Sequence, residues 1–135
     1  MDSLPLQLSV IRLLCFLLLL HRAAVGPYNQ AIKAGNTVYC SGQIGLDPAT
    51  GTMVEGVIAQ ANRAFDNLEA VLTQAGAKMT DVVKFTIFLT DINDFAQVNE
   101  VMASHVPTPY PARSCMQVAA LPKGALVEVE AIAVI

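Results

Sequence analysis

The chain has few of the side chains from which metal sites and nucleophilic sites are built. Charged residues make up only 14% of its 135 residues, and His21 and His105 are the only histidines. Neither histidine has sequence neighbours that resemble a metal-binding cluster, or a Cys-His or Ser-His nucleophile pair. The sequence therefore predicts no metal site.

Cysteine is equally scarce. Cys15, Cys40 and Cys115 are an odd number and lack the CxxC spacing of zinc sites. They indicate neither a disulfide framework nor a zinc site, and they favour a reducing compartment.

The chain also lacks a run of basic residues. Its formal net charge is -3, and acidic residues outnumber basic ones over residues 26–135. A nucleic-acid surface needs lysine and arginine to neutralise phosphates. We therefore expect no nucleic-acid partner.

Aliphatic side chains, in contrast, are abundant. Hydrophobic residues make up 54% of the sequence but aromatic residues only 6%, so a core must rest on valine, isoleucine, leucine and alanine. The length suits one domain that buries most of its unfolded surface. Such a core suits helices packed closely on a sheet, and the apolar content also points to a buried interface between subunits.

Residues 1–25 are predicted to be an apolar leader or an atypical first segment, and residues 26–135 the globular domain. The apolar run Leu13–Leu20 is shorter than the about 20 residues of a membrane-spanning helix, so we expect no stable membrane span. A secretory or organelle leader fits the length, but the charge before the run and the exit HRAAV fit its cleavage pattern poorly. The other interpretations are a first strand or helix packed on the domain, and a non-standard segment joined at about Ala23. We expect the protein in the cytoplasm or in mitochondria.

The first part of the domain indicates a hairpin followed by a helix. A strand is expected around Thr37 to Ser41 after a Gly-Asn turn, and the segment DPATG suits a tight reversal. Between Glu55 and Ala75, apolar residues recur at the three-to-four spacing of an amphipathic helix. Gly76 stands where a left-handed C-cap would end that helix.

Residues 81–91 have the two-residue period of a strand that is covered on one face. Lys84 and Thr86 are expected on the uncovered face. The residues expected on the covered face are Val83, Phe85, Ile87 and Leu89.

A second helix is expected next, with Asn93 or Asp94 as its cap, and it must end before Pro107. The segments CMQVAAL and LVEVEAIAVI then read as two strands joined by PKG. The order strand, strand, helix, strand, helix, strand, strand predicts an α+β domain in which two helices pack on one face of a mixed sheet. The apolar residues of the second helix are Phe95, Val98 and Met102.

Four segments of the chain stand out together: GPYNQAI, YCSGQIGLDPATG, DVVKFTIFLTDINDFAQVNE and YPARSCMQVAALPKGALVEVEAIAV. They resemble the reactive-intermediate deaminase family, the Rid or YjgF-like proteins. The resemblance covers Gly26 to Ile135, and PARS followed by VAxLPxxAxVEVEAIA is its most specific part.

The resemblance implies a chorismate mutase-like fold, which agrees with the predicted element order, and a homotrimer with sites in the clefts between subunits. It also implies an enzyme. The reaction is hydrolysis of reactive enamine and imine intermediates, such as 2-iminobutanoate and 2-iminopropanoate, to 2-oxo acids and ammonia. No cofactor is required for it.

Arg113 follows PYPA and directly precedes a run that reads as a buried strand. Taken alone, it could be a loop arginine in a screened salt bridge at the surface. The resemblance places the family's catalytic arginine at this position, where the turn would deliver it to a cleft. A guanidinium offers a carboxylate two parallel donors, which would orient the adjacent imine carbon for water.

Glu128 and Glu130 lie two residues apart in the last strand, hence on one face. In so apolar a segment, at least one carboxylate needs a partner or a task. The resemblance implies that Glu128 holds or polarises the attacking water as a general base. Either carboxylate could instead pair with a lysine or arginine of a neighbouring strand, and this alternative is stronger for Glu130.

Four more positions are carried over from the resemblance as substrate-binding residues: Tyr28 in GPY, Ser41 in CSGQ, Asn99 in QVNE and Cys115 in PARSC. Taken alone, they read as a turn residue, a strand end, a helix-surface residue and a small core filler, in that order. For Cys115 we expect the backbone carbonyl to matter more than the sulfur, because hydrolysis of an electrophilic iminium needs positioned water and no covalent step.

Three classes of function remain open from the sequence. The favoured one is the imine and enamine deaminase. The second is an endoribonuclease that inhibits translation, an activity also ascribed to the family, but the acidic balance and the absence of a paired-histidine site weigh against it. The third is a small-ligand binder or holdase-like protein without turnover.

Overall fold

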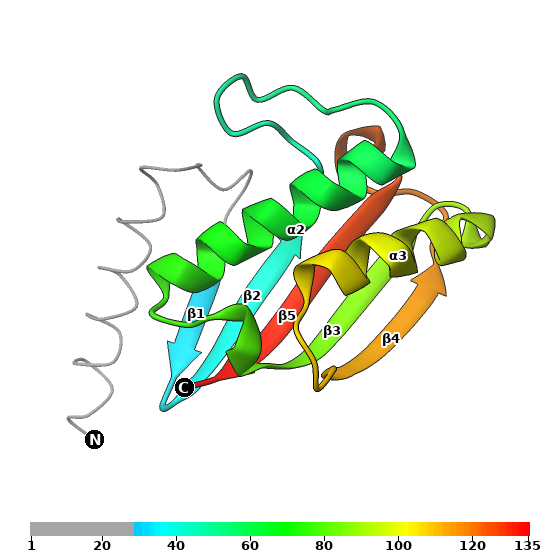
Figure 1. The fold of residues 1–135 in the computed structure, drawn as a ribbon. Coiled ribbons are helices and arrows are strands. Elements are labelled where there is room, and N and C mark those ends of the chain that lie inside the picture. Colours follow the sequence, from blue (N-terminus) through cyan, green and yellow to red (C-terminus); the bar gives the residue numbers. More distant parts are fainter. Residues whose placement is uncertain (1–28) are drawn as a thin grey trace.

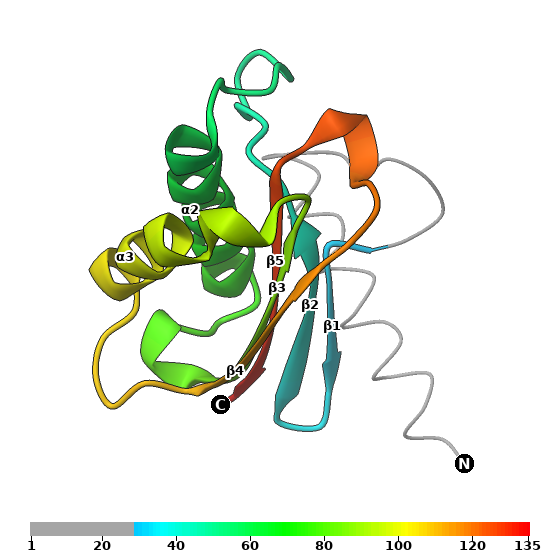
Figure 2. The same ribbon diagram turned by 90° about the vertical axis from the view of Figure 1, so that its right-hand side faces the viewer.

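The computed structural model describes residues 29–135, which form one sheet with two helices on one of its faces (Figures 1 and 2). We call the covered side the helix face and the other side the open face. The predicted leader lies outside the described residues. The strands are β1 (Ala31–Ala34), β2 (Thr37–Gln43), β3 (Val82–Leu89), β4 (Ala112–Gln117) and β5 (Val127–Val134), and the helices are α2 (Val57–Gln74) and α3 (Phe95–His105).

The sheet has the strand order β1-β2-β5-β3-β4. Every neighbouring pair is antiparallel except β3 and β4, which run parallel. A parallel pair needs a crossover, and α3 supplies it between the two strands. The predicted element order and the mixed α+β sheet with two helices on one face are therefore confirmed.

Helix α2 forms the centre of the core. Its apolar side is fully buried, and the ring of Phe65 meets that of Phe85 on β3 edge-on, with centroids 5.8 Å apart. The backbone of Gly76 has φ +81°, a left-handed conformation that favours glycine, so the predicted end of this helix is confirmed. The remaining buried residues are mostly aliphatic, as the composition requires.

The face assignment of one β3 residue was wrong. Phe85, Ile87 and Leu89 are buried on the helix face as predicted, but Val83 is 48% exposed and Val82 is buried in its place. The register of β3 against β5 shifts between Val82 and Lys84. Such a bulge breaks the two-residue alternation that the prediction extended to the start of the strand.

The start of α3 also differs from the prediction. Asp94 occupies the N-cap position but makes no side-chain capping bond. The carboxylate of Asp91 instead accepts a hydrogen bond from the backbone N–H of Asn93, in a short 3-10 turn that leads into the helix. The helix ends at His105, before Pro107, as expected.

Strand β4 corrects the expectation for Arg113. The strand begins at Ala112, so Arg113 lies within it and not in the preceding turn. Strand β4 is also half-exposed, because it is an edge strand of the sheet. The prediction that a buried strand follows Arg113 is therefore wrong. Among residues 29–135, no helix is both long and apolar enough to cross a membrane.

Candidate functional site

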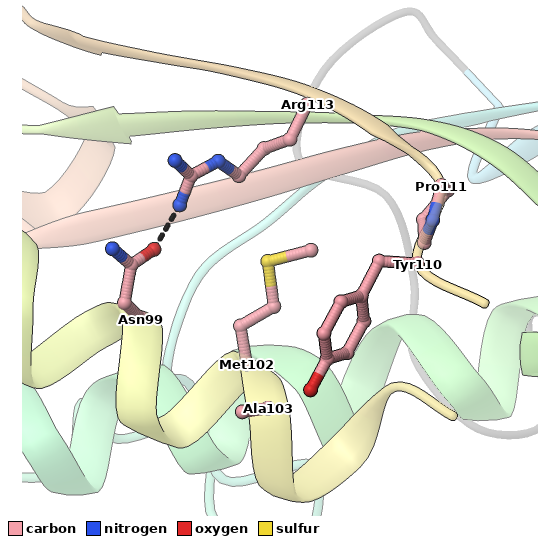
Figure 3. Close-up of a pocket in the computed structure, with 6 residues that line it drawn as sticks. All are labelled: Asn99, Met102, Ala103, Tyr110, Pro111 and Arg113. Carbon is pink, nitrogen blue, oxygen red and sulfur yellow. Dashed lines mark hydrogen bonds between the residues drawn. The ribbon is translucent and has the colours of Figure 1, made fainter. Parts of the chain in front are cut away.

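Arg113 points to the helix face, although it lies on an edge strand. It stands opposite Phe85 in the parallel register of β3 and β4, and Phe85 is fully buried beneath the helices. The guanidinium reaches α3, where Nη1 donates a hydrogen bond to Oδ1 of Asn99 (Figure 3). Its central carbon lies over the ring of Phe95, 4.9 Å from the centroid.

These two contacts hold the guanidinium and leave its charge available. Phe95 covers a flat side of the group, whereas anions approach the edge that carries the N–H donors. Within residues 29–135, no carboxylate lies at ion-pair distance from Arg113. An arginine held in this way is suited to an anionic ligand.

A pocket of about 270 Å³ opens beside Arg113. Figure 3 shows that the Met102 side chain points up from α3 toward the arginine stem, while the Tyr110 ring stands at the other end. The lining residues are Asn99, Met102, Ala103, Tyr110, Pro111 and Arg113. Helix α3 and the segment before β4 therefore build one pocket, with the cation at one end.

Cys115 follows Arg113 on the same face of β4 and packs against the core. Burial raises the pKa of its thiol above the ordinary 9.0, and the Arg113 charge lowers that pKa by less. The group therefore stays a protonated thiol at neutral pH, which makes it a poor nucleophile.

Glu128 and Glu130 point to the open face. They alternate along β5 with Val127 and Val129, which are fully buried on the helix face. Burial, and then the charge of Glu130, raise the pKa of Glu128. Lys84 lines a second pocket together with Glu130. Its Nζ donates a hydrogen bond to the hydroxyl of Ser114 rather than to Glu130.

Gly42 lets β2 approach Glu128 closely. A side-chain carbon at this glycine would lie 2.6 Å from Cδ of Glu128, which is too close for any real contact. The neighbouring Ser41 donates a hydrogen bond from its hydroxyl to the backbone oxygen of Asn29, over 2.6 Å. Tyr28, the remaining predicted substrate-binding residue, lies outside the described residues.

The predicted site residues thus fall into two groups on opposite faces of the sheet. Arg113, Asn99 and Cys115 lie on the helix face, whereas Glu128 lies on the open face beside Gly42. Strand β3 separates β4 from β5. One protomer therefore does not bring Arg113 and Glu128 together.

A profile of the endoribonuclease L-PSP family matches residues 20–135. The chain belongs to this family. The sequence indicates a resemblance to the Rid or YjgF-like proteins, and this resemblance is confirmed. Relatives and solved structures with these names match most of the chain.

Three relatives illustrate how closely the chain matches the family. The 2-iminobutanoate/2-iminopropanoate deaminase of Capra hircus is 51% identical over 113 residues, which are 83% of this chain and 82% of that protein. RidA from an Antarctic Psychrobacter is 55% identical with a TM-score of 0.82, covering 84% of this chain and 92% of that chain. TdcF of E. coli, solved with bound serine, is 44% identical with a TM-score of 0.78, covering 84% and 91%.

Sequence reasoning missed several residues of the pocket in this Rid-family chain. Phe95 and Asn99 are one helical turn apart, so their common face could have been recognised from their spacing. Sequence reasoning instead assigned Phe95 to the apolar face of the helix. Met102 lies three residues after Asn99 and shares this face, whereas Tyr110 carries no comparable signal, because its position beside Arg113 depends on how α3 crosses β4.

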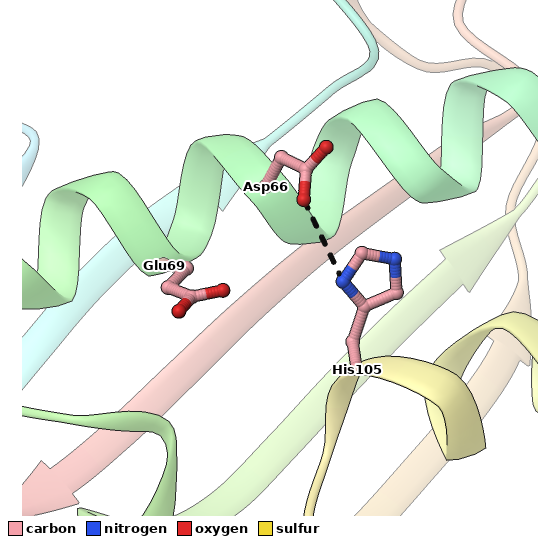
Figure 4. Close-up of side chains that lie close together, drawn as sticks. All are labelled: Asp66, Glu69 and His105. Carbon is pink, nitrogen blue, oxygen red and sulfur yellow. Dashed lines mark ion pairs between the residues drawn. The ribbon is translucent and has the colours of Figure 1, made fainter.

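Elsewhere in the described residues, His105 meets two carboxylates that are remote from it in the sequence. Ligand atoms of Asp66, Glu69 and His105 lie within 4.8 Å of one another, and both carboxylates are exposed (Figure 4). His105 Nδ1 is 3.6 Å from Asp66 Oδ1, its Nε2 is 2.8 Å from Asn62 Oδ1, and its ring stacks on Phe65. Through these contacts His105 links α3 to α2, which the sequence did not predict.

Proposed function

We propose that this Rid-family chain is a 2-iminobutanoate/2-iminopropanoate deaminase that hydrolyses reactive enamines and imines to 2-oxo acids and ammonia. The observation that carries the proposal is the state of Arg113. Asn99 and Phe95 hold its guanidinium beside a pocket, and no carboxylate among residues 29–135 pairs with it. The relative named as this deaminase matches over most of the chain.

In the proposed reaction, two parallel N–H groups of Arg113 bind the substrate carboxylate. This grip orients the adjacent C=N carbon, to which water adds to form a carbinolamine. Loss of ammonia from that intermediate leaves the 2-oxo acid. An enamine substrate first takes a proton on carbon and becomes the imine.

Glu128 serves as the proposed general base. Its raised pKa brings the carboxylate nearer to the pH at which it must accept a proton from water. The proton then passes to the leaving nitrogen. Asn99 orients Arg113, Cys115 contributes its backbone carbonyl, and Ser41 and Tyr28 are proposed to contact the substrate. The mechanism requires no cofactor.

The opposite positions of Arg113 and Glu128 support a site between subunits. We propose a homotrimer in which Arg113 and Asn99 of one subunit face Glu128 and Ser41 of the next. No helix among residues 29–135 covers the open face (Figure 2), which presents the apolar side chains of Tyr39, Met116 and Val134. A neighbouring subunit would bury such a surface.

The proposal is tested by measuring 2-oxo acid and ammonia formation from 2-iminobutanoate, which a threonine dehydratase generates in the assay. We compare the full chain with Arg113→Lys. Lysine keeps the charge but lacks the two-pronged donor, so kcat/KM should fall by about 10- to 100-fold. Folding of the variant is checked by circular dichroism and its size by light scattering.

Each alternative function has its own outcome in this test. If the folded wild type binds 2-oxobutanoate without accelerating imine hydrolysis, the protein is a ligand binder and not this enzyme. RNA cleavage that persists in Arg113→Lys and declines steeply with salt would support the endoribonuclease that the family description names.

A further inference from the structure

Two buried amide side chains bond each other beside the end of β2. Gln43 is 2% exposed and Gln30 6%, and Nε2 of Gln43 donates a hydrogen bond to Oε1 of Gln30 over 2.7 Å. A buried amide costs free energy unless it is hydrogen-bonded. Apolar side chains of similar size would fill the same space without that requirement, so the pair indicates a role beyond packing.

The pair lies next to the bulge of β2. Ser41 and Gly42 of β2 together lie opposite Glu130 of β5, so β2 carries one extra residue here. A bulge disrupts the regular ladder of hydrogen bonds between two strands. The position of these two residues therefore depends on other contacts.

The chain around Ser41 occupies all three of its hydrogen-bonding groups. Its N–H donates to the backbone oxygen of Gln30 over 2.9 Å, and its hydroxyl donates to the backbone oxygen of Asn29. Its carbonyl oxygen accepts a hydrogen bond of 3.3 Å from Nε2 of Gln43, the same nitrogen that bonds Gln30. Gln43 thus connects the bulge to the chain that leads into β1.

The amide pair and Glu128 lie on opposite sides of this bulge. Gln43 pairs with Val129 in the strand register, so its side chain points to the helix face. A side chain at the preceding Gly42 would point to the open face and collide with Glu128. The pair therefore holds from the helix face the backbone against which Glu128 lies on the open face.

We propose that the Gln30–Gln43 pair positions Glu128 by fixing the bulge beside its side chain. The proposal rests on the proposed function, in which Glu128 is the general base. The pair acts through the backbone of Ser41 and Gly42, so its two members are positioning residues. The pair and Glu128 belong to the same protomer, and the neighbouring subunit does not enter this contact.

The experiment replaces both members of the pair in the full chain, as Gln30→Met/Gln43→Met. Methionine is unbranched and adapts to the space of a glutamine. Removing one partner leaves a buried amide unpaired, whereas replacing both by apolar groups of similar shape is nearly neutral for stability. We expect the double variant to melt close to the wild type, while kcat/KM for 2-iminobutanoate falls at least about tenfold, because the base loses its orientation.

Two comparisons separate positioning from a loss of stability. Val71→Ala removes buried apolar contacts near the end of α2, so it should lower the melting temperature and leave kcat/KM unchanged. In the Glu128→Gln background, the two methionines should reduce the residual activity little further, because both changes affect one group. Gln43→Asn keeps the amide but shortens its reach, and it is measured in the same way if the double variant does not fold.

Each other result overturns a specific claim. Wild-type kcat/KM in the folded double variant, or a loss that is equally large in the Glu128→Gln background, would refute the positioning and leave the deaminase proposal standing. If the folded wild type hydrolyses no imine, the deaminase proposal fails, and the positioning fails with it.

Discussion

At the residue scale, the contacts of Arg113 differ from those of an ordinary surface arginine. A surface arginine usually finds a carboxylate and remains hydrated, and such a pair adds little stability. Arg113 has an aromatic ring against its guanidinium and an amide oxygen as its hydrogen-bond partner. Both neighbours orient the group without neutralising it, which keeps it able to bind an anion.

Glu128 makes a prediction about pH. Because its folded-state pKa is raised above the ordinary 4.5, the carboxylate becomes protonated, and inactive as a base, at a higher pH than a free glutamate. We expect kcat/KM to fall as pH decreases through that raised pKa. The measurement is a pH profile of kcat/KM for imine hydrolysis over roughly pH 4 to 8.

Glu130→Gln is the control for this pH profile. Burial is the larger cause of the raised pKa and the charge of Glu130 the smaller, so the variant should move the acid limb slightly downward but not to 4.5. Glu128→Gln should lose most of the activity at every pH. An acid limb that stays unchanged in a fully active Glu128→Gln would remove Glu128 from the mechanism.

At the scale of elements, the close approach of β2 to the Glu128 side chain on β5 depends on one glycine. Near Gly42 the register of β2 shifts, between Cys40 and Gln43, and the strand passes directly against Glu128. A bulge of this kind redirects side chains where a sheet carries a site. The glycine thus leaves room for the Glu128 side chain on the open face.

Gly42→Ala is predicted to displace the Glu128 carboxylate while the sheet remains intact. The added methyl group would occupy the place of the glutamate side chain, which is flexible enough to rotate away. We expect kcat/KM to fall by at least about tenfold, because a misplaced catalytic group loses its orientation. Steady-state kinetics and a thermal melt report the two effects separately.

A double variant tests whether Gly42 acts through Glu128. In the Glu128→Gln background, Gly42→Ala should reduce the residual activity little further, because the two changes affect the same group. Fully additive losses would mean that the glycine matters for another reason.

At the scale of the whole molecule, the sheet itself divides the candidate site. Side chains on opposite faces cannot reach a common substrate within one protomer, so the proposed chemistry requires a second copy. The open face has the apolar residues for such a contact, and its polar residues include Glu128 and Glu130.

Mixed oligomers provide a direct test of the divided site. Arg113→Ala and Glu128→Gln chains, each inactive alone, are co-expressed with different tags and purified as mixed trimers. Every mixed trimer, whatever its ratio of the two chains, has one site in three that receives both intact residues, so we expect about a third of the wild-type activity. Mixed trimers as inactive as their parents would show that both residues act within one subunit.

The sequence determined the order of elements and the composition of the core. Apolar residues recur every three to four residues in α2 and every second residue in β3 and β5. These patterns can be recognised in the sequence because each residue is buried or exposed according to its place in its own helix or strand. The end of α2 at Gly76 was likewise predictable, since few other residues accept its backbone conformation. Arg113 and Glu128 were identified as candidates from motifs in the chain, whereas their spatial relation was not.

Tertiary structure alone decided which face each candidate occupies and which residues surround it. The bulge at the start of β3 moved Val83 out of the core, and the earlier start of β4 placed Arg113 within a strand under α3. Strand register and helix crossing arise from contacts between segments far apart in the chain. No local pattern records such contacts, so the division of the site between two faces appears only when the sheet is assembled.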